Sequence, residues 1–247
     1  MMQNLVTSET ASIIGIDLAW GDKRPDGVCL IRANRTSADL IETGLVQGDK
    51  EFAEWLALRV PKNAAALLTI DAPLVVPNST GGRPVDRQIS IDFGKYHAAC
   101  HSANSHKCAR PLRIANMLRS EGYLVDFDLN KSARIATEVY PHPAMIRFFE
   151  IDRIIKYKKG LVAAKREEFR RLQGLITSCL ARDFVELTVT PTIEKLLQAP
   201  WTKNIEDQTD ALFCALIGYR HWMTKGAACE VVGSLDTGFI LLPPLKS

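Results

Sequence analysis

The sequence lacks any run of about 18 apolar residues, which is the length that a membrane-spanning helix needs. Its first residues, MMQNLVTSET, have neither the basic start nor the apolar middle of a signal peptide. We therefore expect a cytoplasmic protein with no membrane partner. Cysteine is sparse, with 6 among 247 residues, and the scattered positions predict free thiols rather than a disulfide framework.

Strong net charge is also lacking. The formal charge of +3 is compatible with a phosphate-bearing partner but does not require one. Few aromatic residues lie among the basic ones, which disfavours a stacking platform for single strands. The chain of 247 residues, 47% of them hydrophobic, is long enough to bury a full core. The sequence does not indicate an oligomeric state.

Hydrophobic patterning predicts an α/β protein that begins with an antiparallel meander. The residues between the fourth strand and the second helix, 73–108, are rich in turn formers and predict a long loop or a partly helical insertion. Asn204 is the expected N-cap of the last helix. The predicted strands are 12–18, 27–33, 39–45, 65–70 and 136–140, the predicted helices are 48–59, 110–121, 143–150, 161–184, 190–198 and 204–225, and a hairpin is expected at 229–233 and 238–242.

Two of these apolar strands end on an aspartate. Asp17 closes the run SIIGID, and burial of an unpaired carboxylate there would cost several kcal/mol. A divalent metal ion would offset that cost, so Asp17 is a candidate ligand. Asp71 follows the fourth strand, although an aspartate before Ala-Pro could also simply start a turn.

Six motifs in order carry a family resemblance: IGIDLAWG, TIDAPL, GGRPVDR, TEVYPHP, YKKG and DQTDALFCAL. Together they resemble the domain-of-unknown-function family numbered 429, whose members are regarded as predicted ribonuclease-H-like nucleases. The resemblance implies a three-layer α/β fold, with a mixed central sheet in the order 3-2-1-4-5 and helices on both faces. It implies one domain over 1–247, with an insertion at about 73–122 and added helices at about 143–200.

In such a sheet the first and fourth strands are adjacent and parallel, so Asp17 and Asp71 would meet at their ends. Asp210, and with it Asp207, would approach from the final helix, where DQTDA resembles the paired late aspartates of Holliday-junction resolvases. Two-metal hydrolysis of phosphodiesters needs carboxylates that clamp both ions, and Mg²⁺ or Mn²⁺ prefers such oxygen ligands. We therefore predict Asp17, Asp71 and Asp210 as catalytic residues and metal ligands.

Two further acids are auxiliary candidates for the metal. Asp207 lies near a helix N-terminus, where the helix dipole favours an acid whatever the function. Glu138, in the predicted strand 136–140, is either a further ligand or the partner of a nearby arginine.

A cluster of histidine and cysteine lies in the predicted insertion. The spacing of His97 and His101 would suit two ligands on one helix face, and Cys100 lies between them, which raises zinc as an alternative metal. No established zinc spacing is present, so zinc is disfavoured. We expect His97 and His101 to face the substrate instead.

Basic residues form the last group of candidates. The family resemblance covers four of them, which are predicted to hold phosphates, whereas most charge runs are simply solvated faces. The four are Arg83, Lys158, Lys159 and Arg166.

The function predicted from the sequence is a metal-dependent nuclease or phosphodiesterase that acts on nucleic acid or on another phosphate-bearing substrate. One alternative is a nucleotide phosphotransferase or ATPase of related fold, although no Walker lysine motif is present. Another is a module that binds nucleic acid or protein without catalysis, because one fold hosts many functions.

Overall fold

A mixed sheet lies at the centre of the computed structural model, which describes residues 4–244. Its seven strands have the order β5-β6-β4-β1-β2-β3-β7, and a separate hairpin is formed by β8 and β9. The strands are β1 (Thr10–Asp17), β2 (Asp26–Asn34), β3 (Ala38–Val46), β4 (Ala66–Ile70), β5 (Leu124–Val125), β6 (Arg134–Glu138), β7 (Leu187–Val189), β8 (Glu230–Ser234) and β9 (Gly238–Leu242).

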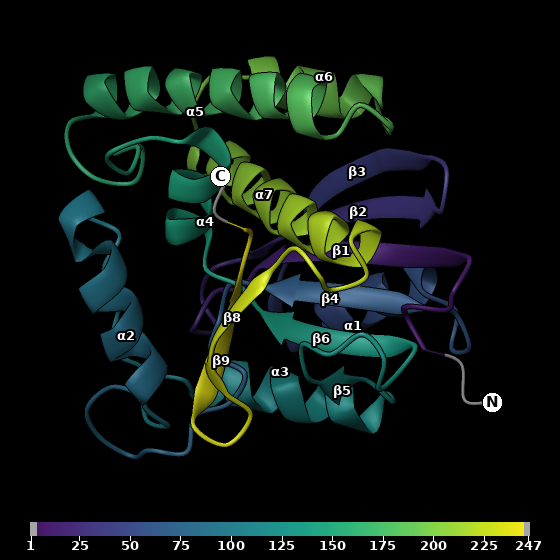
Figure 1. Ribbon diagram of the computed structural model, residues 1–247. Coiled ribbons are helices and arrows are strands. Elements are labelled where there is room, and N and C mark those ends of the chain that lie inside the picture. Colours follow the sequence, from purple (N-terminus) through teal and green to yellow (C-terminus); the bar gives the residue numbers. More distant parts are fainter. Residues whose placement is uncertain (1–3, 245–247) are drawn as a thin grey trace.

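The direction of the strands decides where their ends meet. The predicted antiparallel meander is confirmed, because β2 pairs antiparallel with both β1 and β3. β4 runs parallel to β1, and β6 runs parallel to β4. The carboxyl ends of β1, β4 and β6 therefore lie at one edge of the sheet, and in Figure 1 the arrowheads of β4 and β6 point toward the side where α4 and α2 lie.

Helices cover both faces of this sheet, so the chain is a mixed α/β protein (Figure 1). On one face α7 lies directly on the strands, and α5 and α6 lie outside it. On the other face α1 and α3 pack against side chains such as Ile14 and Leu68. The helices are α1 (Gly48–Arg59), α2 (Pro84–Phe93), α3 (Ala109–Ser120), α4 (Pro141–Phe149), α5 (Val162–Asp183), α6 (Pro191–Gln198) and α7 (Lys203–Met223).

Two glycines let α7 approach the sheet more closely than a side chain would allow. A Cβ at Gly15 on β1 would lie 2.0 Å from the carbonyl oxygen of Ala211 on α7. A Cβ at Gly27 on β2 would lie 2.1 Å from the carbonyl oxygen of Asp207. The first turns of α7 are thus held against the end of β1, which brings the acids of α7 close to Asp17.

The structure differs from the predictions in two places, the N-cap of α7 and two short strands. Thr202, not Asn204, is the N-cap of α7, since its side chain accepts a hydrogen bond from the amide of Ile205. The short strands β5 and β7 were not predicted, because two or three residues carry too little periodicity to be recognised. The segment after β4 is partly helical, which is one of the two forms predicted for it, with α2 and the 3₁₀ turn η1 (Gly94–Tyr96).

Among the described residues, no helix has both the length and the apolar character that crossing a membrane requires.

Candidate functional site

Three acids from distant parts of the chain converge beside the end of β1. Asp17, Asp207 and Asp210 each offer a carboxylate oxygen, and these oxygens all lie within 4.8 Å of one another. Asp17 is the last residue of β1, whereas Asp207 and Asp210 are one turn apart on α7. Among the Asp, Glu, His and Cys side chains of residues 4–244, these three form the group whose ligand atoms are close enough to share a metal ion.

Asp210 is the most deeply buried member of this group, with no exposed surface. Its Oδ1 accepts a hydrogen bond of 2.6 Å from the hydroxyl of Tyr157. Its Oδ2 lies 2.9 Å from Nζ of Lys158 and forms an ion pair with it. This ion pair is the contact that Oδ2 makes among the described residues, and a carboxylate oxygen has lone pairs to spare for a further ligand.

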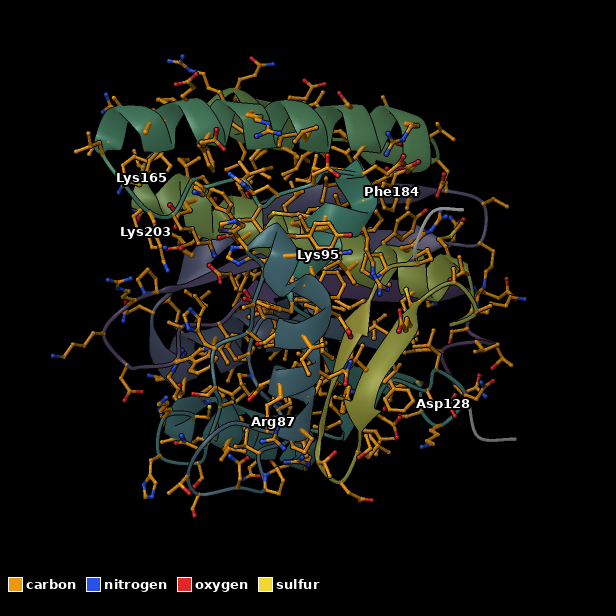
Figure 2. The ribbon with its side chains drawn as sticks, turned by 60° about the vertical axis from the view of Figure 1, so that its left-hand side comes forward. Arg87, Lys95, Asp128, Lys165, Phe184 and Lys203 are labelled. Atoms are coloured by element: carbon orange, nitrogen blue, oxygen red, sulfur yellow. The ribbon has the colours of Figure 1, made fainter. Side chains whose placement is uncertain are left out.

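The negative charge of Asp207 is balanced by Lys203, the first residue of α7. Nζ of Lys203 lies 2.7 Å from Oδ1 of Asp207 and 2.7 Å from Oε1 of Glu206. The other oxygen of Glu206 accepts a hydrogen bond from the indole of Trp201, and Lys165 on α5 lies over that ring. Figure 2 shows Lys165 and Lys203 on the same side of the molecule, where α5 passes over the start of α7.

Burial and mutual repulsion raise the pKa values of the two acids at the strand ends. Burial raises the pKa of Asp17 well above its usual range; Lys158 opposes this rise, while Asp210, Asp71 and Asp207 add to it. Burial also raises the pKa of Asp71 to about 7, again opposed by Lys158 and increased by Asp210 and Glu138. Asp71 follows β4 directly, and its amide donates to the carbonyl of Ile16, so it neighbours Asp17 without belonging to the group of three.

Glu138 has a different partner from the other acids. Its Oε1 accepts a hydrogen bond of 2.7 Å from Nη2 of Arg83, and its Oε2 accepts from Nη1 of Arg83 and from the amide of Leu74. Arg83 is 1% exposed and also pairs with Asp86. Of the two roles considered for Glu138, the arginine partner is the one that the contacts support, and both guanidinium and carboxylate are engaged in a buried network.

A cavity of about 850 Å³ opens beside Asp17 and Asp71. The predicted substrate residues that line it are Arg83, His97, His101, Lys158 and Lys159. Arg166 does not line it; this residue lies exposed on α5.

The geometry of the histidine and cysteine segment corrects one prediction. His97 has a left-handed backbone, with φ of 63°, where it ends η1, and His101 lies in an irregular stretch. They therefore do not share a helix face. Neither these histidines nor Cys100 belong to the close group of candidate ligands in the described part of the chain.

One family model matches most of the chain. It is described as "Protein of unknown function (DUF429)" and covers residues 15–234. The chain belongs to this family. A comparison with curated proteins and a comparison with solved structures each give no significant match.

The part of the chain matched by the DUF429 model contains the whole acidic site. It also contains site residues that the sequence did not single out. Tyr157 and His142 lie within motifs that carry the resemblance, YKKG and TEVYPHP, but nothing in the sequence indicated that they would lie at the site, where Tyr157 donates to Asp210. His142 lines the cavity, and burial together with the charges of Lys158, His101 and Lys159 lowers its pKa to about 3, so at neutral pH it is an uncharged imidazole.

The donor set fits a hard divalent cation. All three close ligands are carboxylates, and the buried Oδ2 of Asp210 is held among the described residues by its ion pair with Lys158. Oxygen ligands of this kind suit Mg²⁺ or Mn²⁺ better than zinc, which favours nitrogen and sulfur.

Proposed function

We propose that this protein is a metal-dependent nuclease or phosphodiesterase with a ribonuclease-H-like fold. The observation that carries the proposal is the convergence of Asp17, Asp207 and Asp210, whose oxygens lie within 4.8 Å of one another although β1 and α7 are far apart in the sequence. Lys158 and Lys203 pair with Asp210 and Asp207, whereas Asp17 has no ion pair within residues 4–244, and a bound cation would offset the repulsion that remains. A site of this composition is well suited to Mg²⁺ or Mn²⁺.

The arrangement of the sheet supports the fold assignment. The run β3-β2-β1-β4-β6 corresponds to the order 3-2-1-4-5, with β6 in the fifth position and the short β5 and β7 added at the two edges. β1 to β3 form an antiparallel meander, and β4 and β6 run parallel to β1. Acids at the ends of the first and fourth strands and on the last long helix are where such a hydrolase would carry them.

Each residue of the site has a chemical role in the proposal. Asp17, Asp207 and Asp210 hold the divalent cation, whose chemistry at such a site is polarisation of a phosphoryl oxygen and activation of water. Asp71, with a pKa of about 7, accepts a proton from the attacking water, because a base works best when its pKa lies near the working pH. Lys158 and Lys159, which line the cavity, supply positive charge to the phosphate.

Arg83 and Glu138 have a structural role in this proposal. Their buried network ties the start of α2 to the end of β6, which shapes one wall of the cavity. The substrate is a nucleic acid or another phosphate-bearing molecule.

The test is a titration of Mg²⁺ and Mn²⁺ with single-stranded, double-stranded and branched DNA and with RNA. Wild type should cleave at least one of these substrates, and Asp17→Asn should lower the rate by about 100-fold or more. Asp152→Asn is the matched control, since Asp152 is an exposed acid in the loop after α4 and its loss should leave cleavage unchanged. Full cleavage by Asp17→Asn would contradict the proposal, and ATP hydrolysis without any cleavage of nucleic acid would favour a phosphotransferase.

A further inference from the structure

Lys158 is an unexpected member of the acidic site, because it places a fixed positive charge among the carboxylates. It lies in the loop between α4 and α5, directly after Tyr157, which has no exposed surface. Tyr157 packs against Phe169 of α5 with ring centroids 6.1 Å apart, and its hydroxyl donates to Asp210. This anchor fixes the backbone at Lys158 and directs the lysine toward the acids.

The contacts of Lys158 are those that a cation would make. Its Nζ lies 2.9 Å from the Oδ2 of Asp210 and forms an ion pair with it. The charges of Asp17 and Asp71 also act on this ammonium group. Lys158 therefore places its positive charge where a cation among these acids would lie.

The placement of the acids indicates how many metal ions the site holds. Among the described residues, one group of three acids is close enough to share an ion, and it consists of Asp17, Asp207 and Asp210. Asp71 lies outside this group, and the positive charge that acts on it is that of Lys158. One divalent ion therefore has its ligands, whereas the acids beside Asp71 are already faced by a lysine.

We propose that the ammonium group of Lys158 takes the place of one of the two cations of a two-metal site, so that this protein binds a single divalent ion between Asp17, Asp207 and Asp210. This inference rests on the proposed function and makes it more specific. An ammonium group is a compact point charge and is suited to this replacement.

The position of Lys158 also gives it access to substrate. Its side chain is 30% exposed, and it lines both the cavity beside Asp71 and a second cavity, of about 560 Å³, beside Asp207. A phosphate that spans the two cavities would meet the lysine and the metal ligands together. The lysine would then stabilise negative charge that develops on the phosphoryl oxygens.

The test counts the bound ions. Mn²⁺ is titrated into wild type, Lys158→Met and Lys159→Met, and free Mn²⁺ is measured by electron paramagnetic resonance. Methionine keeps the apolar stem of lysine and removes the charge, and Lys159 is a matched control because it lines the same cavity without an ion pair to the acids in the described residues. Circular dichroism confirms that each variant is folded.

We expect one ion in wild type and in Lys159→Met. We expect two ions in Lys158→Met, with the first bound about tenfold more tightly because a nearby positive charge is gone. Two ions in wild type, or still one in Lys158→Met, would overturn the inference about the lysine while leaving the proposed metal site intact. No ion in any of the three would instead refute the metal site itself, and the inference with it.

Discussion

The substitution Asp71→Asn keeps the shape of the side chain and removes its negative charge, which is unfavourable in the folded, metal-free protein. Burial and the charges of Asp210 and Glu138 raise the pKa of Asp71 from 3.8 to about 7, although Lys158 opposes the rise. No hydrogen bond to the Asp71 side chain is found within residues 4–244. We therefore expect Asp71→Asn to stabilise the metal-free protein at neutral and alkaline pH.

The sign follows from proton linkage. Because the folded pKa is above the unfolded one, the folded state binds more protons between pH 4 and pH 7, and the stability of wild type falls as the pH rises through this range. A shift of about three units corresponds to a ceiling of about 4 kcal/mol. Asp71 is partly exposed, so solvent screening reduces the expected gain for Asp71→Asn to about 2 kcal/mol at pH 8.

The assay is urea unfolding in the presence of a chelator at pH 5 and at pH 8. The gain of Asp71→Asn over wild type should be about 2 kcal/mol at pH 8 and markedly smaller at pH 5. Asp152→Asn, which removes an exposed acid, should change stability little at either pH. A loss of stability in Asp71→Asn at pH 8, or a difference from wild type that does not vary with pH, would refute this account of the site's electrostatics.

Three further substitutions test the packing and the buried network. Gly15→Ala would place a Cβ 2.0 Å from a carbonyl oxygen of α7, so we expect a loss of about 3 kcal/mol in chemical denaturation and weaker Mn²⁺ binding as α7 moves away; unchanged values would contradict the close packing. Glu138→Gln should cost about 3 kcal/mol, because Arg83 loses one charged partner, yet it should leave the number of bound Mn²⁺ ions unchanged; a lost ion would make Glu138 a ligand. Tyr157→Phe removes the 2.6 Å hydrogen bond to Asp210 and should lower the stability of the metal-free protein by about 1 kcal/mol in thermal unfolding, an effect that should be absent if the hydroxyl is solvated instead.

The parts of this fold that the sequence predicts well are the long periodic elements. The helix predicted at 48–59 is α1 with the same bounds, and β1, β4 and the hairpin of β8 and β9 are displaced by no more than about two residues. The position of Asp17 was predictable because a charged residue at the end of a buried strand is costly and therefore conspicuous. In these cases the signal lies in neighbouring residues of the sequence, so no contact between distant residues was needed to predict the structure.

The parts that the sequence could not give depend on contacts between distant residues. Arg83 and Glu138 are 55 positions apart, and nothing local indicates that they pair. Lys158 was predicted to hold phosphate, but its ion pair with Asp210 depends on the anchor at Tyr157 and could not be predicted from the basic run. The sequence also did not indicate that Asp207 lies closer to Asp17 and Asp210 than Asp71 does, because its position depends on the contact of α7 with Gly27.

The central claim is that Asp17, Asp207 and Asp210 hold a divalent cation, and anomalous diffraction from crystals grown with Mn²⁺ tests it most directly. The account predicts one anomalous peak at about 2.2 Å from a carboxylate oxygen of each of these aspartates. A peak elsewhere, with Lys158 and the three carboxylates in contact only with one another, would contradict it.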